Sequence, residues 1–292
     1  MSLAGITVMV FMILHLSGDP TSLMLPLEAT PEDVERFRHI MGFDRPLISQ
    51  YLDFLRGIVA GDFGESFRYR SPAMSVVLER VPATAILTGG ALLVTLLVAI
   101  PLGVLAAVKK DSVWDRVATV LALVGQAVPG FFLAIMMIYV FAVRLSLVPT
   151  YGFSGWRSLI LPSITLGLYS AAALTRLLRA NLSEVLRQDY IRTATAKGVT
   201  RRIMVIRHGM RNAFLPVLTL LGIQVGVLLG GSVITETVFA WPGLGRLMIQ
   251  AVLNRDYPVV QAAVFFTAIV FLVINFLIDL LYSVLDPRIR YQ

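Results

Sequence analysis

The chain has 292 residues; 57% of them are hydrophobic, only 15% are charged, and the formal net charge is +7. Soluble domains are closer to half apolar and a quarter charged, so the composition is that of a membrane protein. The sequence contains no cysteine, which excludes disulfides and thiolate metal ligands. It also contains no Gly-Lys dipeptide, which excludes a Walker A phosphate loop, so any ATP that this protein uses is bound by another chain.

Uncharged runs long enough to cross a bilayer as helices recur along the chain. About 20 apolar residues are needed to span the ~30 Å of hydrocarbon. The first run, within residues 1–17, is short and contains His15; we interpret it as a transmembrane helix whose start is missing, and a signal peptide is the alternative. Five longer runs follow, so the sequence predicts an all-α membrane protein with six transmembrane helices. These five runs are residues 83–108, 117–143, 158–175, 212–235 and 258–278.

A long polar segment, residues 18–82, separates the first two predicted spans. Thr30 and Pro31 are typical of a helix start, and Gly42 is positioned to end that helix. A second amphipathic helix is predicted after Pro46. We expect this segment to pack against the membrane ends of the spans, and contact with an external partner is the alternative. The apolar face of the second helix contains Ile48, Tyr51, Leu52, Leu55 and Val59.

The charges divide the predicted loops into two sets. Residues 109–116, 176–211 and 279–292 hold 14 Lys/Arg and 6 Asp/Glu, whereas residues 17–82, 144–157 and 236–256 hold 11 and 12. The positive-inside rule places the first set, and with it both termini, in the cytoplasm. The excess positive charge then faces the cytoplasm and anionic lipid headgroups, and no soluble basic domain is left to bind nucleic acid.

The middle of every predicted span lacks charge. Secondary transporters usually keep ionisable residues at this depth, so the pattern argues against proton or sodium coupling. The strong hydrogen-bonding side chains inside the runs are amides, namely Gln126, Gln224, Gln261 and Asn275.

Three small residues recur every four positions on one face of the fifth run: Gly222, Gly226 and Gly230. Such a stripe predicts close packing against another helix, either within this subunit or on a sister subunit.

The segment 236–245 follows the fifth run. Its Pro242-Gly243 pair suits a type II turn, and Phe239 and Trp241 suit an aromatic anchor at the membrane interface. We expect a structural role here rather than substrate contact. No metal site is expected, because the three histidines are remote from one another in sequence and no acidic cluster accompanies them.

The basic segment 189–216 contains the candidate functional element. Asp189 suits the N-cap of a short helix, Tyr190–Lys197, and Gly198 can end that helix in the left-handed conformation. Thr200 suits the cap of a second helix, Arg201–Asn212, which leads into the fifth span. A short helix held in this way suits docking into a groove of a moving partner, and the alternative is a solvated basic loop.

This segment resembles the "EAA" loop in the permease subunits of ABC importers. The resemblance rests on Arg192-Thr193-Ala194, Gly198 and Leu215-Pro216. Arg192-Thr193 in place of Glu-Ala, and a Gly-to-Pro spacing of 18 residues, are typical of the dipeptide/oligopeptide/nickel branch. Further motifs of that branch occur in order over nearly the whole chain: LSGDP at 16–20, GDFGES at 61–66, RVPAT at 80–84, LPS at 161–163, YIRTA at 190–194, RHGMRN at 207–212, ETVFAWPGLG at 236–245 and LDPRIRY at 285–291.

The resemblance implies a type I ABC importer permease fold of the first, B-type, permease of a pair. Residues 83–286 would form a five-helix core with a cytoplasmic coupling loop at 176–212, and residues 287–292 a cytoplasmic tail. Within the loop, the short helix would be the coupling helix that contacts the ATP-binding subunit. The coupling residues carried over in this way are Asp189, Tyr190, Arg192, Thr193, Ala194, Ala196, Lys197, Gly198, Leu215 and Pro216.

The resemblance further implies a partner set and a cargo. A homologous second permease, two cytoplasmic ATPases that bind ATP and Mg²⁺, and an external binding protein would complete the importer in the bacterial inner membrane, with no cofactor on this chain. Di- and oligopeptides are the expected cargo. Glutathione, nickel chelates and oligosaccharides stay open as alternatives, and a self-sufficient carrier or channel is the alternative mechanism.

Overall fold

The computed structural model describes residues 5, 7–8, 11–12, 30–42 and 44–285, and within them the chain is helical without any strand. The predicted first span therefore lies largely outside the described residues; those of its residues that are described, 5, 7–8 and 11–12, are helical. The helices are α3 (Pro31–Met41), α4 (Leu47–Ala60), α5 (Ala73–Val108), α6 (Val113–Ala127), α7 (Gly130–Met137), the π-helix η1 (Ile138–Arg144), α8 (Trp156–Val185), α9 (Asp189–Ala196), α10 (Arg201–Ile203), the π-helix η2 (Met204–Gly209), α11 (Met210–Leu229), α12 (Val233–Val238), α13 (Leu244–Leu253) and α14 (Tyr257–Leu285).

Four helical stretches in the described part of the chain are long and apolar enough to cross a membrane: α5, α8, the continuous stretch Arg201–Leu229, and α14. A fifth candidate is bent by 97° between α6 and the α7–η1 helix. The predicted span at residues 117–143 is therefore broken into two helices at the proline that it contains. The break lies at Val128, which is extended (φ −74°, ψ 122°), because Pro129 disfavours a helical conformation in the residue before it.

Two further helix bounds differ from the predicted ones. The third predicted span, residues 158–175, continues as α8 to Val185, so the first ten residues of the predicted cytoplasmic loop are helical. Arginines in this extension contact α6. The Arg179 guanidinium pairs with the Asp115 carboxylate, which is 5% exposed. The fifth predicted span ends at Leu229 rather than Thr235, because Gly230 and the left-handed Gly231 (φ +100°) turn the chain.

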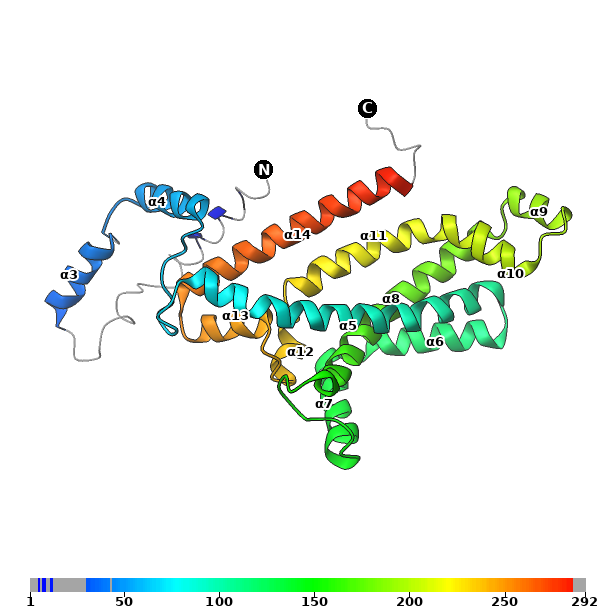
Figure 1. Cartoon of the computed structure of the whole chain (residues 1–292), viewed down its shortest axis with the longest axis horizontal. Coiled ribbons are helices and arrows are strands. Elements are labelled where there is room, and N and C mark those ends of the chain that lie inside the picture. Colours follow the sequence, from blue (N-terminus) through cyan, green and yellow to red (C-terminus); the bar gives the residue numbers. More distant parts are fainter. Residues whose placement is uncertain (1–4, 6, 9–10, 13–29, 43, 286–292) are drawn as a thin grey trace.

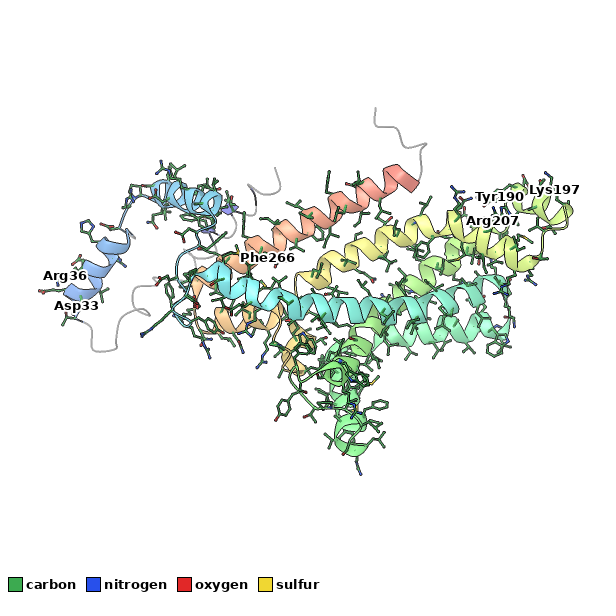
Figure 2. The ribbon with its side chains drawn as sticks, in the orientation of Figure 1. Asp33, Arg36, Tyr190, Lys197, Arg207 and Phe266 are labelled. Carbon is green, nitrogen blue, oxygen red and sulfur yellow. The ribbon has the colours of Figure 1, made fainter. Side chains whose placement is uncertain are left out.

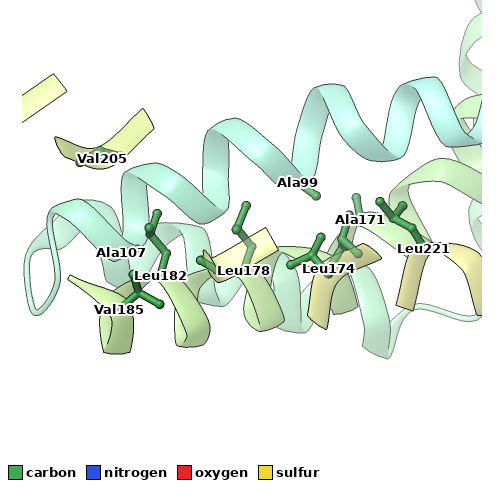
Figure 3. Close-up of a cluster of buried hydrophobic side chains, with 11 residues drawn as sticks. Ala99, Ala107, Ala171, Leu174, Leu178, Leu182, Val185, Val205 and Leu221 are labelled. Carbon is green, nitrogen blue, oxygen red and sulfur yellow. The ribbon is translucent and has the colours of Figure 1, made fainter. Parts of the chain in front are cut away.

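The described helices form an elongated body whose long axis follows α5 (Figure 1). α8 packs along α5, α6 covers both, and α11 lies between α8 and α14. The main core is a layer of alanine, valine and leucine side chains from α5, α8, η2 and α11 (Figure 3). A second core, around Phe63, Val77, Leu247 and Val259, joins the start of α5 to α13 and α14.

Glycines allow the closest helix contacts. A Cβ added to Gly167 on α8 would come within 2.6 Å of the Val94 Cβ and 2.8 Å of the Ala91 carbonyl oxygen on α5. The predicted small-residue stripe of α11 faces α14 of the same chain: an added Cβ would overlap Ile278 at Gly222, and would come within 2.8 Å of Phe271 at Gly226 and of Thr267 at Gly230.

A buried carboxylate organises the segment between α11 and α13. Glu236 is 0% exposed and accepts hydrogen bonds from the Thr84 hydroxyl at 3.1 Å and the Arg246 amide at 2.9 Å. The Thr84 hydroxyl in turn accepts the Leu244 amide at 2.7 Å. A Cβ on Gly243 would lie 2.5 Å from the Glu236 carboxyl carbon. The segment thus wraps its own acidic side chain and ties α12 and α13 to α5.

The aromatic and turn predictions for this segment are wrong. Phe239 and Trp241 are 2% and 0% exposed, and Trp241 donates its indole N–H to the Ala83 carbonyl at 2.9 Å. That hydrogen bond satisfies the indole N–H inside the protein, so the Trp241 ring is a buried core residue and not an anchor at the membrane interface. Gly243 has φ −98°, so it does not take the left-handed position of a type II turn.

The polar segment before α5 contains the two predicted helices. Thr30 caps α3 in a capping box, and the Thr30 hydroxyl and amide hold the pKa of the Asp33 carboxyl below its ordinary value. Gly42 ends α3 with φ +71°.

Along α4, Ile48 and Val59 are 76% and 90% exposed, but Tyr51 on the same face packs against the first run. The Tyr51 hydroxyl lies 2.9 Å from the Thr7 hydroxyl, and the Tyr51 ring lies 5.2 Å from the ring of the buried Phe11. The expected packing of this face is therefore present in part within the described residues.

We predict that Gly167→Ala destabilises the protein by about 1–3 kcal/mol, the usual cost of overpacking a tight contact. The added methyl group meets the α5 backbone, which cannot move aside as a side chain can. The melting temperature of the detergent-purified protein measures this. Gly89→Ala is the matched control, because a Cβ at Gly89 meets no atom within 4 Å. Equal melting temperatures for the two variants would contradict the assigned α5–α8 contact.

A candidate coupling site at one end of the helical body

The short helix α9 is built by local signals in its sequence. Gln188 is the N-cap (φ −71°, ψ 154°), so the prediction of Asp189 in that role is wrong; Asp189 is the first helical residue. A carboxylate in the first turn still interacts favourably with the positive end of the helix dipole. At the other end, Lys197 caps the helix and Gly198 leaves it with φ +77°. Side chains other than glycine rarely adopt that conformation.

One face of α9 is anchored to the helix that follows. Ile191 is 3% exposed and is the one buried side chain of α9. The Tyr190 hydroxyl accepts a hydrogen bond from the Asn212 amide at 2.8 Å and lies 3.5 Å from the His208 carbonyl oxygen. These contacts tie α9 to the junction of η2 and α11.

The base of this element is joined to three membrane helices. Arg201 donates to the Val108 carbonyl, at the end of α5, at 2.8 Å. Val205 of η2 is buried in the main core, which also contains Leu182 and Val185 of α8. A Cβ on Gly209 would lie 3.0 Å from the Leu182 side chain, so η2 approaches α8 closely. Arg201–Leu229 is one continuous helical stretch, and the Tyr190–Asn212 hydrogen bond joins α9 to it.

The other face of α9 is open. The Asp189 and Arg192 side chains are 94% and 77% exposed, and the 3.4 Å contact between them is a weak surface pair. Among the other candidate residues of α9 and the turn after it, one is half-buried, Ala194. The others are exposed, namely Thr193, Ala196, Lys197 and Gly198. Leu215 and Pro216 lie apart from α9, within α11, where Pro216 is exposed and Leu215 half-buried.

Described parts of the two loop sets lie at opposite ends of the body: α9 and the turn between α5 and α6 at one end, and α3 and α4 at the other (Figure 1). Tyr190, Lys197 and Arg207 are at the α9 end, whereas Asp33 and Arg36 are at the far end (Figure 2). The turn between α5 and α6 also lies at the α9 end, because Arg201 donates a hydrogen bond to the carbonyl of Val108 at the end of α5. Segments of the second set contact one another: Gly152 donates to the Phe239 carbonyl at 2.8 Å, and the Phe67 amide donates to Asp256 at 3.2 Å.

Sequence reasoning missed one cluster of polar side chains, where α8 faces α6. Arg179 pairs with Asp115, and Arg176 donates to the Gln126 side-chain oxygen. The missed signal was the spacing of Arg176 and Arg179, three residues apart after an apolar run, which suits continuation of the same helix. Within the described residues, no group of three or more His, Cys, Asp or Glu side chains could hold a metal ion.

The comparisons with known sequences cover the whole length of the chain. Residues 99–291 match the family described as binding-protein-dependent transport system inner membrane component, and residues 1–88 match the N-terminal family of the same systems. The chain is 41% identical over 288 residues to the glutathione transport system permease proteins GsiC of Escherichia coli K12 and Pectobacterium atrosepticum, covering 98% of this chain and 94% of each relative.

Solved structures show the same fold. A chain of the MetNI methionine ABC transporter in an inward-facing conformation superposes with a TM-score of 0.63 at 20% identity, covering 73% of this chain and 97% of that one. An amino acid ABC transporter gives a TM-score of 0.51 at 19% identity over 72% of this chain and 92% of that one.

The resemblance of the motifs is thereby confirmed: the chain belongs to the family of binding-protein-dependent transport system inner membrane components, as an ABC importer permease subunit of the dipeptide/oligopeptide/nickel branch.

Proposed function

We propose that this chain is the permease through which an ATP-driven, binding-protein-dependent importer moves short peptides across the bacterial inner membrane. Glutathione, a tripeptide, is the cargo to test first. The 41% identity to glutathione transport permeases over 98% of the chain supports this choice of cargo. Nickel chelates and oligosaccharides are the alternative cargoes.

The proposed complex contains a homologous second permease, two ATP-binding subunits and an external binding protein. This chain would bind no nucleotide, because it lacks the Gly-Lys of a phosphate loop, and the partners would carry ATP and Mg²⁺. The α9 end would face the cytoplasm together with both termini, since the loops at that end hold the excess of Lys and Arg.

One observation carries the coupling proposal: α9 is anchored on one face and exposed on the other. ATP-driven closure of the partner subunits would press on the exposed face around Arg192 and Lys197. The Tyr190–Asn212 and Arg201–Val108 hydrogen bonds would pass that movement to α11 and α5. The membrane helices then switch between two states, because the partner makes different contacts with α9 in each state.

Co-purification followed by reconstitution tests the proposal. A tagged chain, solubilised in mild detergent, should retain a second permease and one or two nucleotide-binding subunits. Proteoliposomes containing this complex should accumulate glutathione or tri-alanine only when both ATP and the binding protein are supplied. Uptake by the purified chain alone would instead establish a self-sufficient carrier.

We predict that Gly198→Arg uncouples transport from ATP hydrolysis. The left-handed conformation at this residue costs an ordinary side chain about 1–2 kcal/mol, so the stop of α9 and its exposed face should be displaced. Uptake and ATP hydrolysis, measured on the same proteoliposomes, should separate, with hydrolysis continuing. Gly198→Asn is the control, because asparagine tolerates this conformation. Wild-type uptake by Gly198→Arg would contradict the assignment of α9 as the coupling element.

We predict that Tyr190→Phe lowers the amount of cargo moved per ATP by roughly two- to tenfold, the effect of losing a hydrogen bond worth about 0.5–1.5 kcal/mol. The variant keeps the ring and removes only the hydroxyl that Asn212 contacts. Asn212→Ala should have a similar effect, and the double variant should be no worse than either single one. Additive losses would mean that the two residues act independently.

A further inference from the structure

Arg176 is a guanidinium without a counter-ion on a membrane-spanning helix. It lies on α8, one of the four helical stretches that meet the length and hydropathy of a span. Within the described residues it forms no ion pair; it donates to the Gln126 side-chain oxygen, and its Nε has no partner. Arg179, three residues further along, is instead neutralised by two contacts with Asp115.

The contact between Arg176 and Gln126 lies deep in the span. Lys109 and Lys110 mark the end of the body at which α6 begins with Val113. Gln126 is thirteen residues further along α6, about 20 Å at 1.5 Å per residue, against ~30 Å of hydrocarbon. The packing of α6 on α8 agrees with this depth, since a Cβ on Gly125 would lie 3.6 Å from the Ala172 Cβ.

A charge at this depth requires compensation. Ionisable residues within spans face a water-filled cavity or the interior of the helix assembly, and they mark pathways for substrates and ions. Gln126 supplies only a neutral amide. Gln126 is exposed and Arg176 half-buried, so the described helices of this chain do not enclose the pair. An anion that arrives from outside this chain can therefore reach both side chains.

The local backbone has the form of a broken span. The pair lies less than one turn before the Val128-Pro129 break, where the chain bends by 97° into α7. The first turn of α7 has no side-chain cap. Transporters bind their substrates near such breaks, because the interrupted backbone leaves polar groups that a ligand can satisfy.

We propose that Arg176, together with Gln126, binds a carboxylate of the transported molecule during its passage. Arginine presents two parallel N–H donors that match the two oxygens of a carboxylate, and the Gln126 amide adds a further donor. This inference rests on the proposed function, because peptides and glutathione bring the carboxylate as cargo. The site would favour acidic or free C-terminal cargo over neutral cargo.

The complete importer in proteoliposomes, supplied with ATP and its binding protein, tests the proposal with reduced glutathione and tri-alanine as probes. Arg176→Gln should lower uptake at least tenfold while complex assembly and ATP hydrolysis are retained, since a hydrogen bond to a charged group is lost. Arg176→Lys, which keeps the charge, should retain most uptake. Arg116→Gln, which removes the same charge from an exposed position on α6, should leave uptake unchanged.

A second variant separates transport from stability. Gln126→Glu places a fixed carboxylate beside Arg176 and occupies the site. We expect a higher melting temperature together with lower uptake, a combination that a purely structural arginine does not give. Wild-type uptake by either Arg176→Gln or Gln126→Glu would overturn the inference. If the wild-type complex moves neither probe, the proposed function has failed, and this inference, which needs that cargo, fails with it.

Discussion

The close contact between α5 and α8 is the constraint on which the rest of the structure depends. In a bilayer the hydrophobic effect does not draw helices together, so association relies on packing and on internal hydrogen bonds. Gly167 against Ala91 and Val94, with Gly103 against Leu178, brings the two backbones together. Thr95 adds hydrogen bonds to the Ala91 carbonyl at 2.8 Å and the Gly167 carbonyl at 3.1 Å. The other helices are then placed around this pair.

Functional elements occupy positions that this pair makes rigid. At one end, Tyr190 of α9 is hydrogen-bonded to the start of α11, and Arg201, which follows α9, is hydrogen-bonded to the end of α5, as the proposed coupling requires. At the other end, Glu236 and Trp241 fix α12 and α13 to the start of α5. Rigid ends with a broken helix between them suit a protein whose helices move as units between two states.

Two arginines of α8 contact α6, and they differ in whether an acidic side chain neutralises their charge. Arg179 is neutralised by Asp115 and stabilises the packing of α6. Arg176, one turn away, has only Gln126 and remains a net positive charge. Proteins retain such unpaired charge in membranes for function, since stability alone would favour an apolar residue. The same face of α8 therefore combines a structural ion pair with a candidate ligand site.

Four features can be read from local patterns in the sequence: the helical membrane class, the basic and neutral ends of the body, the break before Pro129, and the short helix that stops at Gly198. These follow from composition, charge and local backbone preference, which act over a few residues. Two features come only from the tertiary structure: the extension of α8 through its arginines, and the burial of Glu236 and Trp241. Each of these depends on a partner distant in sequence, such as Asp115 for Arg179 or Ala83 for Trp241, and local patterns contain no information about which distant groups meet.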